Sequence, residues 1–285
     1  MDWLDRMNTV LDYIDDHLTE AIDYEQMAKM SLCSGNLFQR MFSNFTGMSI
    51  SEYIRRRKLS KAGMDLASGD TQVIDIAGRY GYDSPDAFAY AFKRLHGITP
   101  SQAKIKGTTL TNYPRLTFTM KIKGEEKMRY RIVERQEFKV AGKSIKTSQE
   151  ENMKQNSIPK FWDLCKHNGT MSALCAVGLE KPLLGVCYGD ASDGSFLYMV
   201  GVEAKIMQAG FEMISIPQAT WAVFESKGPM PFAIQKVWKE IFQNFLPTSK
   251  YDHAPMADFE LYPEGDNQSQ EYRCEVWIPV VPKRL

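Results

Sequence analysis

The sequence predicts a multidomain protein: an all-α domain of two helix-turn-helix units, then an α+β domain made from a duplicated strand-helix-strand-strand unit. Three observations support this fold class. Apolar residues from Trp3 to Leu18 recur every three or four positions, as on one face of a helix, and this periodicity continues for roughly a hundred residues. The helical pattern repeats after about fifty residues. Beyond Lys106 the period changes to two, which is typical of half-buried strands.

The composition is that of an ordinary soluble globular protein. Among 285 residues, 35 are basic and 35 acidic, so net charge alone indicates no partner. The N-terminus is acidic and no apolar run reaches about 18 residues, so we expect a cytoplasmic protein with no signal peptide and no membrane contact. The five cysteines are odd in number and form no Cys-x-x-Cys pair. We therefore expect reduced thiols, no metal site and no cofactor.

The first helix-turn-helix unit begins after the supporting helix. Asp23 and Ser34 can each cap a helix, and the segment AKMSLCS between them is short enough for a tight turn. The helix SGNLFQRMFSNF would bury its apolar face and expose Asn36, Gln39 and Arg40. Asn and Gln can pair with adenine and Arg with guanine, so these side chains are expected to read bases in the major groove of DNA.

The same pattern returns in a second unit. Residues that match at a spacing of fifty are Phe38 and Phe88, Phe42 and Phe92, Gly47 and Gly97, and Ser51 and Ser101. Ser84 caps the second candidate recognition helix, SPDAFAYAFKRL, and the amphipathic segment SISEYIRRRKLSKAGMDLASGD connects the units. If it holds them one turn of B-DNA apart, roughly 34 Å, one chain could read an asymmetric site. The alternative is a helical bundle with solvent-facing polar residues, and the ordered repeat argues against it.

Residues 5–105 resemble the DNA-binding domain of the AraC/XylS transcription regulators. The resemblance rests on LFQRMFSNFTGMSISEYIRRRKLSKA and VIDIAGRYGYDSPDAFAYAFKRLHGITPSQ, one in each half. It implies a seven-helix fold that binds double-stranded promoter DNA, with RNA polymerase as a partner. It also places Asn36, Gln39 and Arg40 at the base-facing positions of the first recognition helix.

The resemblance gives the second recognition helix four matching positions, Pro85, Asp86, Ala89 and Tyr90. Tyr90 stands where many members of the family carry arginine, and Ala89 offers no hydrogen bond. The second helix is therefore expected to contribute mainly backbone contacts through Lys93 and Arg94, with one contact from Tyr90.

The α+β region follows a segment with the composition of a linker, GTTLTNYP. We expect domains at residues 1–107 and 128–285, with a linker at 108–127. The second domain is expected to contain strands in MRYRIVERQEFKVAGKSI, a helix around IPKFWDLCKHN, and strands LLGVCYGD and SFLYMVGVEA. The order then repeats in FEMISIPQATWAVFESKG, FAIQKVWKEIFQNFL, DFELYPEGD and YRCEVWIPVV. Trp162 and Trp238 take equivalent places in the two helices, and such a duplication predicts a cleft along a pseudo-twofold seam.

Glu275 is anomalous because it lies in the otherwise apolar strand CEVWIPV. One interpretation is an edge-strand glutamate that faces water. However, residues 128–283 resemble the GyrI-like small-molecule-binding domains of gyrase-inhibitory proteins and multidrug-sensing regulators, most clearly in FELYPEGD and YRCEVWIPV. The resemblance implies that Glu275 lies in an aromatic-lined pocket with Trp277, and that Glu260 can join it. The candidate walls of this pocket are Tyr188, Tyr198, Trp221 and Phe224.

These features favour a one-component transcription regulator, an activator by family resemblance, in which a small molecule bound by the second domain changes transcription through the first. A carboxylate among aromatic rings suits a cationic, lipophilic effector. Two alternatives stay open. The second domain could act as a small-molecule hydrolase with Glu275 as general base, or it could bind a protein such as gyrase. We expect regulation rather than enzyme activity and name no catalytic residue.

Overall fold

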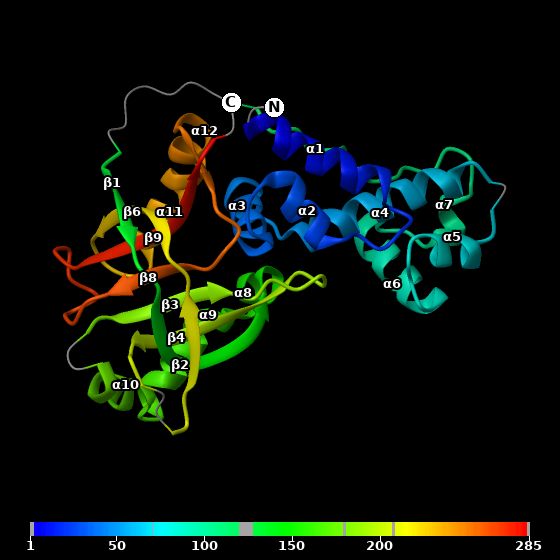
Figure 1. The fold of residues 1–285 in the computed structure, drawn as a ribbon. Coiled ribbons are helices and arrows are strands. Elements are labelled where there is room, and N and C mark those ends of the chain that lie inside the picture. Colours follow the sequence, from blue (N-terminus) through cyan, green and yellow to red (C-terminus); the bar gives the residue numbers. More distant parts are fainter. Residues whose placement is uncertain (1–2, 70, 120–127, 179–180, 207–208, 284–285) are drawn as a thin grey trace.

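The computed structural model describes residues 3–69, 71–119, 128–178, 181–206 and 209–283, and Figure 1 shows a helical region beside a sheet region. The described part of the helical region contains α1 (Trp3–Asp16), α2 (Tyr24–Ser31), α3 (Gly35–Thr46), α4 (Ile50–Ala67), α5 (Val73–Arg79), α6 (Pro85–His96) and α7 (Pro100–Ala103). The all-α prediction for this region is confirmed.

The two helix-turn-helix units share the same local structure. Ser34 and Ser84 each accept a hydrogen bond from the backbone N–H three residues further on, and Asp23 caps α2 in a similar way. Gly47 and Gly97 end α3 and α6 with φ angles of 71° and 77°, in the left-handed region that glycine adopts without steric cost. The repeat in the sequence therefore corresponds to a repeat in the helix boundaries.

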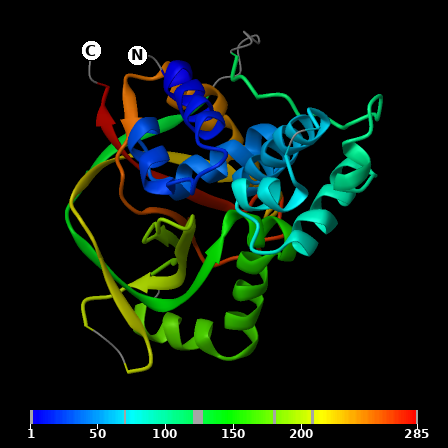
Figure 2. The same ribbon diagram turned by 90° about the vertical axis from the view of Figure 1, so that its right-hand side faces the viewer.

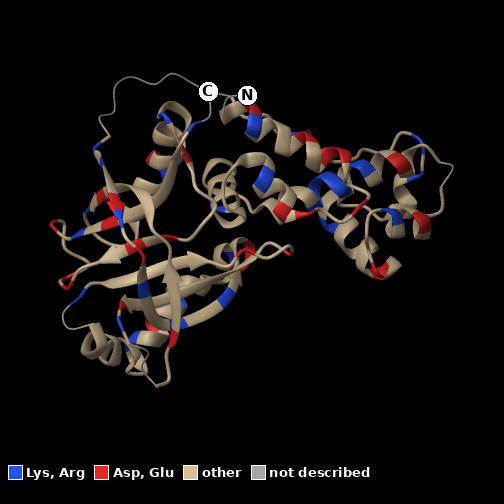
Figure 3. Cartoon of the chain, viewed as in Figure 1, with Lys and Arg blue, Asp and Glu red and all other residues tan. Residues whose placement is uncertain are grey.

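Helix α4 connects the two units and carries a run of basic residues (Figure 3). One of them, Arg57, is buried: it pairs with Asp15 of α1 at 2.5 Å and donates a hydrogen bond to the carbonyl oxygen of Tyr113. A buried arginine needs such partners because an unpaired charge away from water is costly. Arg57 therefore fixes α4 to α1 and is not available to DNA.

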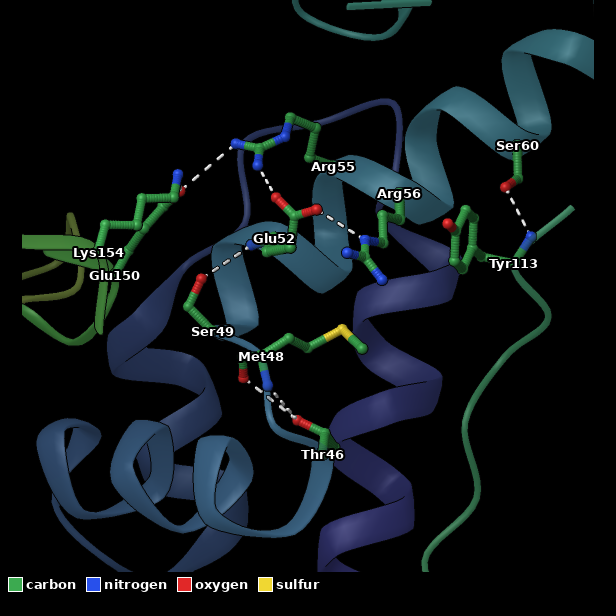
Figure 4. Close-up of polar contacts among 10 residues, drawn as sticks. All are labelled: Thr46, Met48, Ser49, Glu52, Arg55, Arg56, Ser60, Tyr113, Glu150 and Lys154. Atoms are coloured by element: carbon green, nitrogen blue, oxygen red, sulfur yellow. Dashed lines mark hydrogen bonds and ion pairs between the residues drawn. The ribbon is translucent and has the colours of Figure 1, made fainter. Parts of the chain in front are cut away.

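Residues 108–119 of the predicted linker form no helix or strand but lie along the helical region. Asn8 exchanges two hydrogen bonds with the backbone of Phe118, at 3.0 and 2.8 Å. The Phe118 ring packs edge-on against Phe42, and Ser60 accepts a hydrogen bond from the Tyr113 N–H at 2.9 Å (Figure 4). This segment is thus packed onto the helical region, while residues 120–127 of the predicted linker lie outside the described residues.

The sheet region contains nine described strands and several helices. The strands are β1 (Tyr130–Arg135), β2 (Phe138–Ser148), β3 (Leu183–Tyr188), β4 (Ser195–Glu203), β5 (Glu212–Ile216), β6 (Ala219–Lys227), β7 (Tyr251–His253), β8 (Asp258–Tyr262) and β9 (Arg273–Pro282). The helices are α8 (Gln149–Gln155), α9 (Ser157–His167), α10 (Thr170–Gly178), α11 (Phe232–Glu240), the π-helical turn η1 (Ile241–Phe245) and α12 (Leu246–Thr248). Every predicted strand pair and helix has a counterpart, whereas α8, α10 and β7 were not predicted.

The strand order shows the predicted duplication. The order is β1-β6-β9-β8-β3-β4-β2-β5, with β7 paired to β9. The two similar units meet at the central pair of β3 and β8, and the first strand of each unit pairs with the second strand of the other. The α+β prediction is therefore confirmed, and the pseudo-twofold runs through the β3–β8 pair.

The two faces of the sheet have different partners. On one face the curved sheet encloses an apolar core that includes Phe138, Trp221 and Phe259. On the other face α9 and α10 contact β4, and α11 contacts β6 and β9. A continuous apolar core also joins α11 and η1 to the helical region, and α1 contacts α12 (Figure 2). The helix-bearing face of the sheet is therefore the one that the helical region approaches.

Candidate functional site

Helix α3, the first candidate recognition helix, lies against the sheet region (Figure 1). Asn36 and Gln39 are only 3% and 4% exposed, and the Arg40 side chain is 13% exposed. The expectation that these side chains face solvent is therefore wrong for this conformation. The helical pattern identifies the polar face of α3 correctly, but a pattern within one helix cannot show that another domain covers that face.

The N-terminus of α3 is bound by the turn between β3 and β4. Asp190 accepts hydrogen bonds from the backbone N–H groups of Gly35 and Asn36, at 2.8 and 2.9 Å. Gln39 donates a hydrogen bond to the carbonyl oxygen of Gly194 at 2.9 Å. The first turn of a helix has unpaired N–H groups and a positive dipole end, so it suits the carboxylate of Asp190.

Arg40 extends from α3 to β8 and α11. Its Nη2 donates to both carboxylate oxygens of Asp258, at 2.9 Å each, and its guanidinium carbon lies 4.0 Å from the centroid of the Trp238 ring. Burial raises the pKa of Asp258 to about 6, although Arg40 opposes this shift. Burial lowers the pKa of Arg40, but the Asp258 carboxylate more than offsets it, so the net shift is upward. A buried cation is thus held by a carboxylate and an aromatic face.

A second carboxylate lies among aromatic rings beside this cation. Glu260 accepts hydrogen bonds from Trp238 Nε1 at 2.7 Å and from the Tyr262 hydroxyl at 2.8 Å. On the α9 side, the Trp162 ring packs edge-on against Tyr262 and its Nε1 donates to the hydroxyl oxygen of Tyr198 at 2.8 Å. We call these five residues the Glu260 cluster. The cluster joins α9 and α11 across the central strand pair, where the sequence predicts a cleft.

Gly185 makes room for this cluster. It lies opposite Glu260 in the β3–β8 register. A Cβ atom at Gly185 would lie 2.3 Å from the Tyr198 hydroxyl oxygen and 3.3 Å from the Trp162 ring. Burial and the nearby Glu260 raise the pKa of Tyr198 and of Tyr262, so both hydroxyls remain neutral.

The two candidate carboxylates lie on opposite faces of the sheet. Val276 lies opposite Glu260 in the β8–β9 register, so its neighbour Glu275 points to the other face of the sheet. The Glu275 side chain is 24% exposed, pairs with Arg131 at 2.7 Å and accepts a hydrogen bond from Trp277 Nε1. On that face Trp277 packs with Trp221 and Phe259, so Glu275 borders an aromatic cluster, and its role in effector binding stays a prediction. Glu260 lies on the face that α9 and α11 cover, and both carboxylates are half-buried.

The four candidate pocket walls divide between the two faces of the sheet: Trp221 and Tyr188 lie on the face of Trp277 and Glu275, and Tyr198 and Phe224 lie on the face of Glu260. Tyr198 belongs to the Glu260 cluster. Trp221 is buried in the sheet core, with its ring centroid 4.9 Å from that of Phe259. Phe224 is buried against η1, and Tyr188 shares a hydrogen bond with Ser144. Tyr198 is therefore the one of the four that joins Glu260.

Further ion pairs connect the two regions. Arg6 of α1 pairs with Asp252 of β7, and both side chains are buried. Arg55 of α4 bridges Glu52 of its own helix and Glu150 of α8, and lies 3.4 Å from Glu150 (Figure 4). In each interdomain pair the helical region supplies the cation and the sheet region supplies the carboxylate.

The second candidate recognition helix, α6, has a different environment. Its predicted contact residues Asp86, Tyr90, Lys93 and Arg94 are exposed, and Tyr90 is 71% exposed. The expected exposure of this helix is confirmed. The conformation therefore covers the first recognition helix and leaves the second one open.

Sequence reasoning missed Asp190, Asp258 and the role of Trp238. The equivalence of Trp162 and Trp238 pointed to the seam, but Asp190 and Asp258 lie at strand ends, where acids are common. Among the described residues, no group of three or more His, Cys, Asp or Glu side chains is placed to hold a metal ion. None of the described helices has both the length and the apolar character needed to cross a membrane.

Two protein-family models match the chain. Residues 27–104 match a helix-turn-helix domain, and residues 131–280, more than half of the chain, match the integron-associated effector binding protein family. These matches and the fold define a transcription regulator with an effector-binding domain. The chain belongs to the integron-associated effector binding protein family and carries an AraC-type DNA-binding domain at its N-terminus, as the two sequence resemblances predicted.

Curated relatives match the helical region. The HTH-type transcriptional activator AarP of Providencia stuartii is 36% identical over 102 residues, which are 36% of this chain and 76% of AarP. The regulatory protein SoxS of Salmonella typhimurium is 35% identical over 95 residues, 33% of this chain and 89% of SoxS. A solved structure of SAV2435 bound to tetraphenylphosphonium is 26% identical and aligns with 54% of this chain and 94% of that one, with a TM-score of 0.49.

Proposed function

We propose that this protein is a one-component transcription activator whose effector is a small, lipophilic cation bound at the Glu260 cluster. The observation that carries this proposal is the enclosure of the Glu260 carboxylate by Trp238 and Tyr262 at the seam between α9 and α11. A carboxylate removed from water favours a ligand of opposite charge, and aromatic faces attract cations. The surrounding rings favour a ligand with apolar groups, since small-molecule sites are lined mostly by apolar and aromatic side chains with a few polar groups.

DNA binding is assigned to the two recognition helices. We propose that Asn36, Gln39 and Arg40 read bases and that Lys93 and Arg94 contact phosphates, with Asp86 and Tyr90 beside them on α6. The similarity to AarP, which is named an activator, supports activation as the direction of control. RNA polymerase is then the protein partner, and the bacterial cytoplasm is the place of action.

We propose binding without turnover at the effector site. Each carboxylate oxygen of Glu260 already accepts a hydrogen bond from a neutral donor, Trp238 or Tyr262. A carboxylate can accept about four hydrogen bonds, and here two fixed protein donors set its orientation. The arrangement therefore favours a fixed counter-charge for a ligand over a hydrolytic base.

The test is a fluorescence titration of the full chain with tetraphenylphosphonium, using neutral triphenylphosphine oxide for comparison. Glu260→Gln should weaken cation binding more than tenfold, or about 1.4 kcal/mol, and leave the neutral compound nearly unchanged. The matched variant Glu275→Gln should retain the wild-type affinity, because an exposed ion pair contributes about 0 to 1 kcal/mol. A loss caused by Glu275→Gln alone would move the site to the other face of the sheet, and no loss in either variant would refute the proposal.

A further inference from the structure

We propose that Arg40 is an internal ligand of the effector site: its guanidinium group occupies the place of the effector's cationic group, so effector binding displaces α3 and frees it for DNA. This inference rests on the proposed function, since it requires the Glu260 cluster to be the effector site. It adds a mechanism by which effector binding in one domain changes DNA binding by the other. It also makes one residue serve both DNA recognition and effector sensing.

The first step of the argument is the shared position. The guanidinium carbon of Arg40 lies 4.0 Å from the Trp238 ring centroid, which is van der Waals contact. The same tryptophan donates its N–H to Glu260, and Asp258 holds the guanidinium from β8. The guanidinium group of Arg40 thus already occupies the face of Trp238 and the carboxylate of Asp258, next to Glu260. A second cation can stack on this face of Trp238 only after Arg40 has left.

The second step concerns the DNA-binding face of α3. Asp190 binds the N-terminal amides of α3, where a helix can bind a DNA phosphate, and Asp258 binds Arg40, which would otherwise be free to bind guanine. Asn36 and Gln39 are covered by the same surface. The carboxylates of Asp190 and Asp258 thus occupy the positions on α3 at which DNA would bind. In the docked form, in which α3 lies against the sheet region, α3 cannot enter the major groove, so DNA binding by the full double unit requires its release.

The third step is that the contact is suited to reversal. The Oδ1 atom of Asn36 and both ring nitrogens of His253 are buried without a hydrogen-bond partner in the described structure. A cavity of about 200 Å³ lies beside Asn36 and Asp190. Buried ion pairs also carry a desolvation penalty that cancels much of their attraction. The docked form therefore gains little net free energy from its polar contacts, and a ligand cation can compete with it.

The test uses the full chain and two readouts. In the tetraphenylphosphonium titration, Arg40→Ala should bind the cation at least tenfold more tightly than wild type, because the internal competitor is gone. Arg79→Ala is the matched control, since Arg79 pairs with Asp65 on the helical surface, and it should bind as wild type does. If Glu260→Gln weakens binding but Arg40→Ala and Arg79→Ala behave alike, the effector site stands and the role of Arg40 is overturned. If Glu260→Gln has no effect, the proposed site itself fails.

The second readout needs no variant. Hydrogen–deuterium exchange of the peptide covering residues 35–46 should become faster when wild-type protein is saturated with tetraphenylphosphonium, because the Gly35 and Asn36 amides lose Asp190 as acceptor. Peptides from α6, which is exposed already, should change little. Unchanged protection of α3 at saturating cation would overturn the inference.

Discussion

The carboxylate of Asp190 caps the recognition helix α3 by accepting hydrogen bonds from the N–H groups of Gly35 and Asn36, at 2.8 and 2.9 Å. An acid of the effector-binding domain therefore occupies the helix terminus at which DNA phosphates bind in many complexes. Charge-assisted hydrogen bonds of this kind are about twice as strong as neutral ones. Asp190 is thus placed to compete with DNA for the same backbone groups.

Asp190→Asn should increase the affinity of the unliganded protein for DNA. The amide keeps the size of the side chain but turns two charge-assisted hydrogen bonds into at most neutral ones, so docking weakens by about 1 kcal/mol and DNA binds about fivefold more tightly. The measurement is fluorescence anisotropy on a duplex selected from random DNA by the wild-type protein. Glu225→Gln removes the same charge from an exposed pair with Arg273. Equal gains in both variants would indicate a general charge effect and contradict a specific role for Asp190.

Arg40→Ala should reduce the protein's ability to discriminate between specific and random DNA. Both specific and random DNA require the release of α3, so the ratio of the two affinities cancels the docking equilibrium. If Arg40 contacts guanine, this ratio should fall about 5- to 160-fold, which corresponds to about 1 to 3 kcal/mol. Lys93→Ala, on the exposed face of α6, should weaken both affinities alike. An unchanged ratio in Arg40→Ala would reassign Arg40 to a phosphate or to docking alone.

His253 should make the sheet region less stable in mild acid. Burial, with nearby Arg40 adding to it, lowers the pKa of His253 to about 3. The unfolded chain binds a proton near pH 6.5 and the folded chain does not, so this contribution to stability is present above pH 6.5 and is lost as the pH falls toward 3.

The matched variant is His253→Phe, which keeps an aromatic ring and removes the titration. Between pH 7 and pH 5 the wild type should lose about 2 kcal/mol more unfolding free energy than the variant. Urea unfolding followed by tryptophan fluorescence measures this difference. Parallel pH profiles would show that His253 titrates normally and is not buried as described.

A fragment of residues 1–119 should be more stable than a fragment of residues 1–107. The longer fragment retains the hydrogen bonds between Asn8 and Phe118 and the packing of the Phe118 ring on Phe42. These contacts are worth about 1 kcal/mol or more, which raises the melting temperature of a domain of this size by about 5 °C. Equal melting temperatures would show that residues 108–119 do not stabilise the helical domain, and would support the predicted domain end at residue 107.

Much of the fold could be predicted because its signals are local. Residues within one turn determine the helix ends, such as the caps Ser34 and Ser84 and the left-handed Gly47 and Gly97. Because the pattern occurs twice, each copy supports the prediction for the other. The change from helical to alternating periodicity likewise separated the two regions. These features depend on the backbone and on the nearest side chains.

The site could be predicted only in part, because it depends on contacts between distant segments. Alternation shows that Glu260 and Glu275 lie on different faces of paired strands only when the register is known, and it does not show which face the helices cover. The pairing of Arg40 with Asp258 joins residues 218 positions apart in two domains. No pattern within α3 distinguishes a polar side chain that is exposed and free to bind DNA from one that is bound by another domain.

The central claim is that the effector cation and DNA both favour the form with α3 released. The most direct measurement is the affinity of the full chain for tetraphenylphosphonium with and without a saturating selected duplex. By thermodynamic linkage, the cation should bind at least fivefold more tightly in the presence of DNA, and DNA should bind more tightly by the same factor in the presence of the cation. Arg40→Ala should lose most of this coupling. Cation affinity that is unchanged or weaker with DNA bound would contradict the account.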